Sequence, residues 1–423
     1  MSGAVSGLLA PSALLPTGWH PDVEICWGPD GMLESVTPNV PDSPHPTAAG
    51  PVIPGMPNLH SHAFQRALLG RVQHPGPGGD FWSWRNEMYS AVQALTPELL
   101  YQVSAWTYSL MLAAGYTSVV EFHYVHRLGG ASPSRSLEAM MAAARDTGIR
   151  QTMAPVLYRF AGSDGTALSE RQRAFELDHA EFADLVTQIG EAGTTVAIAP
   201  HSLRAVQPDD LHFLVDLVGA DTPVHIHVSE QPAEVAEIRK NLGDTPIAWL
   251  NREFGLSPRW ALVHATQATP AELDLIDDGV ATLVLCPTTE HDLGDGRFPI
   301  ERTPGASWGV GSDSQVSVSP AEELRLLLYG QPAARGKRAV LSSTEHSDGS
   351  SLWQRATQGA SAVTGSPVGR IAPGHAADLM VLDGARPDFT GLTADHLLSA
   401  WVLSGHARQI AEVRVGGDVV AQH

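Results

Sequence analysis

From residue 52 onward the chain alternates short β-branched runs with longer helical patterns, and this alternation restricts the fold more than any other feature. Such alternation predicts a parallel sheet, and eight repeats favour an α/β fold that closes into a (β/α)8 TIM-like barrel. An open doubly wound sheet is the alternative, but no GxGxxG motif follows the first strand. The expected strands are Val52–His60, Thr117–His123, Gln151–Leu157, Thr195–His201, Pro223–Ser229, Trp260–Ala265, Ala281–Pro287 and Ser307–Ser312. Helical patterns, several opened by proline, cover Pro97–Ala114, Pro133–Thr147, Pro208–Val218 and Gln231–Asn241.

The two ends of the chain differ from this repeat. They carry turn residues and short strand-like pieces at Val23–Trp27, Leu33–Val36, Asp378–Leu382 and Ile410–Val415. We expect residues 1–50 and 370–423 to form a small β-sandwich domain. Residues 51–369 would then form the barrel.

The composition limits the partners and the compartment. The 423 residues carry a formal net charge of −20, so the surface repels nucleic acid and anionic lipid. No apolar run reaches the ~18 residues that a membrane helix needs. The first basic residue is Arg66, whereas a signal peptide needs a basic start. With only two cysteines, far apart in sequence, a disulfide framework is not expected. These features predict a cytoplasmic protein with a small-molecule substrate, no nucleic-acid partner and no membrane partner.

Polar side chains gather where the expected strands end. In a (β/α)8 barrel these carboxyl ends meet at one face, where active sites are built. His60 and His62 are two apart on an extended segment, so they share a face and can chelate one ion. With His227 and Asp313 they make a ligand set suited to Zn(II), with one position left for water. Any single histidine among the 19 is better explained as structural, but the set as a whole predicts a metal site.

Several longer motifs resemble the amidohydrolase superfamily of metal-dependent barrel hydrolases, over about residues 50–385. In particular they resemble the members that hydrolyse N-formimino-L-glutamate to N-formyl-L-glutamate and ammonia during histidine degradation. The segments are Pro54–Arg66, Phe81–Arg85, Glu121–His126, Ala199–Arg204, His227–Gln231, Cys286–Glu290, Gly311–Ser314 and Pro373–Leu379. The resemblance implies the same hydrolytic deimination here, in a barrel that often pairs as a homodimer.

Catalytic roles can be assigned to three residues that lie at or next to the ends of the expected strands. Asp313 would accept a proton from the attacking water, and His264 would polarise the developing tetrahedral centre. Glu230, three residues after His227, would bind the cationic amidine and shuttle a proton to the leaving nitrogen. A solvated carboxylate at the start of a helix is the alternative for Glu230.

Two arginines are candidates for gripping the carboxylates of such a substrate. Arg85 and Arg204 offer bidentate hydrogen bonds, and the resemblance adds Gln65, Tyr124 and His201 to the pocket. Alternatives remain for each of these residues: Arg85 could only stack on Trp82 or Trp84, and Arg204 could pair with Asp209 or Asp210. His201 could be a buried structural donor, and Tyr124 a core aromatic.

The number of metals follows from the lysines. Binuclear members of the superfamily bridge two metals through a carboxylated lysine at the end of strand 4, whereas here that strand ends in His201 and neither Lys240 nor Lys337 ends a strand. One Zn(II) per chain is therefore expected. His123 and His126 would point in different directions, and Cys286 lacks a paired base, so neither is expected to form a second reactive site.

The sequence departs from the family pattern at two residues. Arg127 and Gln315 stand where the resemblance would place histidine, which bears on fine substrate choice.

Two other functions are considered. One is a mononuclear zinc deaminase of a purine, pterin or triazine ring. The other is a catalytically inactive barrel scaffold, but such a protein is free to lose ligands and this chain has the full set.

Overall fold

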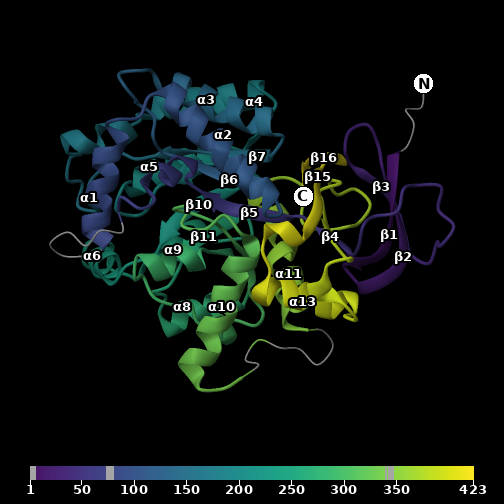
Figure 1. Cartoon of the computed structure of the whole chain (residues 1–423). Coiled ribbons are helices and arrows are strands. Elements are labelled where there is room, and N and C mark those ends of the chain that lie inside the picture. Colours follow the sequence, from purple (N-terminus) through teal and green to yellow (C-terminus); the bar gives the residue numbers. More distant parts are fainter. Residues whose placement is uncertain (1–5, 73–80, 339–340, 342–346) are drawn as a thin grey trace.

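The computed structural model describes residues 6–72, 81–338, 341 and 347–423. Eight parallel strand positions form the barrel on the left of Figure 1, with helices around them. In chain order they are β5 (Met56–Ser61), β6 (Tyr116–His123), β7 (Arg150–Leu157), the pair β8 (Thr195–Val196) and β9 (Ala199–Pro200), β10 (Val224–Val228), β11 (Trp260–His264), β12 (Thr282–Leu285) and β13 (Ser307–Val310). These strands form two parallel sheets, β5-β6-β7-β8 and β10-β11-β12-β13.

Isolated bridges join the two sheets into a closed barrel. One side closes through the pairs Ile198–Val224 and Ser202–His227, and the other through Ser61–Asp313. The predicted TIM-like barrel is therefore confirmed, with every expected strand in place.

The helices begin largely where the sequence places them. Proline occupies the first turn of eight α-helices, where its missing N–H costs no hydrogen bond. α6 begins at Pro232, one residue later than predicted, because Gln231 takes the extended N-cap conformation. The α-helices are α1 (Phe81–Val92), α2 (Pro97–Ala113), α3 (Pro133–Thr147), α4 (His179–Glu191), α5 (Pro208–Leu217), α6 (Pro232–Leu242), α7 (Pro246–Phe254), α8 (Pro270–Asp277), α9 (Pro287–Asp292), α10 (Pro320–Arg335), α11 (Asp348–Gln358), α12 (Ala360–Thr364) and α13 (Ala394–Ser404). Short 3-10 turns are η1 (Ala63–Leu68), η2 (Glu170–Phe175), η3 (Ile300–Arg302), η4 (Pro387–Phe389) and η5 (Ala407–Gln409).

The two ends of the chain combine into one seven-stranded sheet at the right of Figure 1, where purple and yellow segments lie beside each other. Its order is β16 (Asp418–Gln422), β15 (Ile410–Val415), β14 (Leu379–Leu382), β4 (Val52–Pro54), β1 (Ser6–Leu15), β2 (Gly18–Trp27) and β3 (Leu33–Thr37). The strands follow a single hydrogen-bonded path. The domain limits at residues 50 and 370 stay a prediction, since β4 joins this sheet and α13 packs on α10 and α11.

The first predicted strand is divided at Gly55. Residues before it pair with β1 and β14 of the small sheet, and residues after it enter the barrel. A Cβ at Gly55 would lie 2.2 Å from the Thr117 side chain, so the chain can pass between the two sheets only with glycine there. The bidentate pair of Arg150 with Asp378, at 2.9 Å, also joins the barrel to the small sheet.

Candidate metal centre and active site

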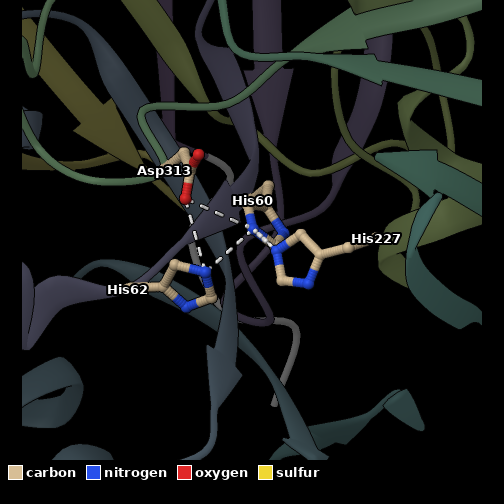
Figure 2. A group of neighbouring side chains, drawn as sticks. All are labelled: His60, His62, His227 and Asp313. Carbon is tan, nitrogen blue, oxygen red and sulfur yellow. Dashed lines mark hydrogen bonds and ion pairs between the residues drawn. The ribbon is translucent and has the colours of Figure 1, made fainter. Parts of the chain in front are cut away.

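Three histidines and one aspartate meet at the carboxyl end of the barrel (Figure 2). β5 supplies His60, and His62 follows directly after the end of β5. β10 supplies His227, and the turn after β13 supplies Asp313. The Nε2 atom of His60 lies 3.1 Å from Nε2 of both His62 and His227. Asp313 Oδ1 lies 3.6 Å from His60 Nε2 and 3.3 Å from His62 Nε2. The four predicted ligands therefore face one point.

The hydrogen bonds of the rings fit a metal at that point. His62 donates Nδ1–H to the Phe122 carbonyl at 2.9 Å, and His227 donates Nδ1–H to the His201 carbonyl at 3.0 Å. Each of these two Nε2 atoms then carries a lone pair that a metal can accept, and each lies 3.1 Å from His60 Nε2. Burial lowers the pKa of His60 to about 3 and lowers the pKa of His62 and His227, so the three rings stay neutral and can ligate a metal. Nitrogen and carboxylate donors suit Zn(II).

Left-handed backbone conformations mark the strand ends at this face. Ser229, His264 and Asp313 have φ values of 51°, 72° and 44°, which non-glycine residues rarely adopt. Such positions cost about 1–3 kcal/mol each and persist where the surroundings impose them. They turn the polar side chains inward at the point where each strand stops.

His264 lies among three carboxylates. Its Nε2 is 3.7 Å from both Glu230 and Asp313, and its Nδ1 is 3.3 Å from Glu290. Burial alone would lower the pKa of His264, but the three carboxylates outweigh it and raise that pKa to about 10. Sequence reasoning missed Glu290, although its place five residues after the end of the barrel strand β12 was a usable signal.

A cavity opens onto the metal ligands. All five residues predicted to bind substrate line it, namely Gln65, Arg85, Tyr124, His201 and Arg204. Gln65 donates to the Tyr124 hydroxyl at 2.8 Å, which fixes both side chains. Glu230 also lines the cavity, and burial raises its pKa to about 7.

Arg204 is a deeply buried charge facing the cavity, with 6% of its surface exposed. Among the described residues its Nε has no hydrogen-bond partner. The alternative pairing with Asp210 is wrong, because that carboxylate binds Arg159 and, at 2.7 Å, His179. Burial disfavours the charge on Arg204, but Glu234, Tyr158 and Glu230 outweigh it and raise the pKa of the guanidinium.

Arg85 reaches the cavity from α1, with its guanidinium carbon 5.7 Å from the Tyr89 ring centroid. The alternative for Arg85 is stacking on Trp82 or Trp84. The Trp82 side chain is outside the described part of the structure, and Trp84 lines the cavity. Sequence reasoning missed the apolar wall of Met88, Tyr89, Tyr158, Phe175 and Leu293. These residues come from separate helices and loops, and no spacing rule connects them.

The remaining reactive groups have other partners. His126 donates from Nε2 to the Val156 carbonyl at 2.9 Å, beside the ring of His123. Cys286 lies with His264 and Glu290 in a second group of ligand-type atoms. Burial raises the pKa of the Cys286 thiol well above its ordinary value, so it stays protonated. Arg127 pairs with Glu181 and lies outside the cavity.

The chain belongs to the amidohydrolase family, whose sequence profile matches residues 52–420. Formimidoylglutamate deiminase from Pseudomonas aeruginosa is 40% identical, over 99% of this chain and 95% of that protein. The crystal structure of an amidohydrolase from Brucella melitensis superposes with a TM-score of 0.91 at 36% identity, covering 98% of this chain and 94% of that one. The fold is shared by a zinc-bound adenosine deaminase from Xanthomonas campestris, with a TM-score of 0.79 at 22% identity and coverage of 98% and 92%.

In the part of the chain that the structure describes, no helix combines the length and the apolar character needed to cross a membrane.

Proposed function

We propose that this chain hydrolyses N-formimino-L-glutamate to N-formyl-L-glutamate and ammonia in histidine degradation, with one Zn(II) per chain. The observation that carries this proposal is a single cavity with metal ligands at one end and two arginines in its wall. A dicarboxylate attached to a cationic amidine matches this arrangement of charge. The 40% identity to formimidoylglutamate deiminase over nearly the whole chain supports the same substrate.

His60, His62, His227 and Asp313 would hold the zinc. When bound, zinc supplies Lewis acidity, which acidifies water enough to give a nucleophile near neutral pH. Water adds to the amidine carbon, the bond from that carbon to the terminal nitrogen breaks, and ammonia leaves. The oxygen of the water becomes the formyl oxygen of the product.

Side chains next to the metal ligands would carry out the proton transfers. Asp313 Oδ2, 3.7 Å from His264, would accept the proton of the attacking water. His264, held as a cation by its three carboxylates, would stabilise negative charge at the tetrahedral carbon. Glu230 would bind the amidine N–H groups as a carboxylate and then deliver a proton to the departing nitrogen. A pKa near 7 suits a group that gives and takes a proton at neutral pH.

The substrate carboxylates would be held by Arg85 and Arg204. Tyr124, Gln65 and His201 complete the wall between these arginines and the metal ligands. The alternative is a deaminase of a purine, pterin or triazine ring, which could stack on the aromatic wall of the cavity. The two cations in that wall favour a dicarboxylate over a neutral ring.

Histidine variants on β10 test the metal-dependent mechanism. We expect H227Q to lose stoichiometric zinc and at least 10³-fold in kcat/KM, because one of the four ligands is removed. H225Q is the matched control: His225 lies two residues earlier, is equally buried, and donates to the Val363 carbonyl at 2.7 Å, away from the ligands. Full activity in H227Q would contradict the mechanism, while equal losses in both variants would point to misfolding.

We also propose a cytoplasmic homodimer. Two buried unpaired cysteines support a reducing compartment. Sedimentation equilibrium should return twice the chain mass, and a monomer mass at micromolar concentration would contradict the dimer.

A further inference from the structure

The junction between β5 and β13 carries three of the four proposed zinc ligands. His60 lies in β5, His62 follows directly after it, and Asp313 follows β13. The strands meet through an isolated bridge, in which Asp313 N–H donates to the His60 carbonyl at 3.0 Å and His62 N–H donates to the Asp313 carbonyl at 3.1 Å. The relative position of these ligands therefore depends on how firmly this junction is held.

Three buried side chains join the junction from behind the ligands, and we call Gln315, Ser61 and Glu121 the closure network. Gln315 donates from Nε2 to the Asp313 carbonyl at 2.8 Å and to the Ser61 hydroxyl at 3.0 Å. Ser61 in turn donates to Glu121 at 2.8 Å. Glu121 also accepts from the Ala63 backbone N–H at 2.9 Å, just beyond His62. The network thus links the segment that follows β13 to β5 and β6.

Burial and backbone strain show that Gln315 is held firmly in this place. Its side chain is 0% exposed, and its φ of 65° is left-handed. Among the described residues its Oε1 has no hydrogen-bond partner, a loss that buried amides seldom tolerate. Arg66 anchors the Gln315 carbonyl at 2.9 Å. A strained, partly unsatisfied residue that persists is expected where its remaining bonds have a role.

The closure network lies outside the substrate cavity, since none of its three residues is among those that line it. The network contacts the Asp313 backbone through Gln315, and its member Ser61 lies between His60 and His62 in the chain. Outer groups of this kind orient ligands, and their loss commonly weakens metal affinity 10–100-fold. The departure from the family pattern at Gln315 therefore acts on the ligand frame, not on the substrate.

We propose that Gln315 and Ser61 are positioning residues that lock the His60–His62 pair against Asp313 and thereby set the affinity of the site for zinc. This inference rests on the zinc site of the proposed function. Substrate recognition by Arg85 and Arg204 is independent of it.

The test measures the zinc dissociation constant of metal-depleted, folded protein by competition with a chromophoric chelator. We expect Q315L and S61A each to raise that constant 10–100-fold, with KM at saturating zinc within about threefold of wild type. The double variant should lose less than the product of the single losses, because the two residues share one hydrogen bond. Q315N, with a shorter amide, should keep part of the affinity.

Q331L is the matched control. Gln331 is equally buried on α10 and donates to two backbone carbonyls, of Phe298 at 3.1 Å and Leu327 at 3.3 Å. Its loss should lower stability without changing zinc affinity. Zinc constants of Q315L and S61A within threefold of wild type, or an equal loss in Q331L, would overturn the inference. If Q315L does not fold, S61A alone decides. Wild type that binds no stoichiometric zinc would instead refute the proposed function.

Discussion

Replacing Arg204 by methionine removes a buried guanidinium from the cavity wall while keeping much of the side-chain volume. A guanidinium–carboxylate contact contains two charge-assisted hydrogen bonds, each worth about 1.5–3 kcal/mol. Glu230 and Glu234 already offset part of the Arg204 charge, so the lower end of this range applies. A loss of about 3 kcal/mol corresponds to a roughly 10²-fold fall in kcat/KM for N-formimino-L-glutamate.

The assay compares two substrates on zinc-loaded enzyme. N-butylformamidine carries the reacting amidine but no carboxylate, so the R204M variant and wild type should hydrolyse it at similar, low rates. R127M is the matched control, because Arg127 pairs with Glu181 outside the cavity. A fall of less than threefold for N-formimino-L-glutamate, or an equal fall for the amidine without carboxylates, would refute the role of Arg204.

Three further predictions concern the metal, pH and the two sheets. Chelation of zinc that is initially present at 100 times its Kd should lower Tm by about 3 °C in calorimetry, because bound ligand contributes about 2.7 kcal/mol at that concentration. Burial raises the pKa of Glu230 to about 7. The value of kcat/KM should therefore fall as the pH drops below 7, because the Glu230 carboxylate becomes protonated. A pH profile that stays flat down to pH 5 would exclude Glu230 as the group that binds the amidine. D378N should lower the free energy of unfolding by about 1–3 kcal/mol in urea titrations, because the largely buried carboxylate binds Arg150 and Gly416 N–H. E138Q, at an exposed pair with Arg135, should change it by less than about 0.5 kcal/mol.

The barrel could be predicted because its signals are local. Each barrel strand is a short apolar run ended by polar residues, and eight of the α-helices have a start signal in proline. The limits of elements that depend on tertiary contacts could not be predicted in the same way. Val52–His60 is one continuous run in sequence, yet only packing against Thr117 shows that Gly55 divides it between two sheets. β1 was not foreseen, because Pro11 interrupts its apolar pattern while the strand continues through it.

The metal ligands could likewise be predicted from their places at strand ends, which the barrel brings to one face. The buried polar partners around them could not. Glu290 contacts His264 and Gln315 contacts Ser61, which are residues 26 and 254 positions apart along the chain. The aromatic wall from Tyr89 to Phe175 combines α1 and η2, whose approach depends on the completed fold.

Ammonia release by zinc-loaded protein tests the central claim most directly. N-formimino-L-glutamate should be hydrolysed with a kcat/KM at least 10²-fold above that for N-formimino-L-aspartate, guanine or adenosine, because the two arginines fit a dicarboxylate of one length. Fast ammonia release from guanine or adenosine, with none from the glutamate compound, would contradict the assignment of the cavity.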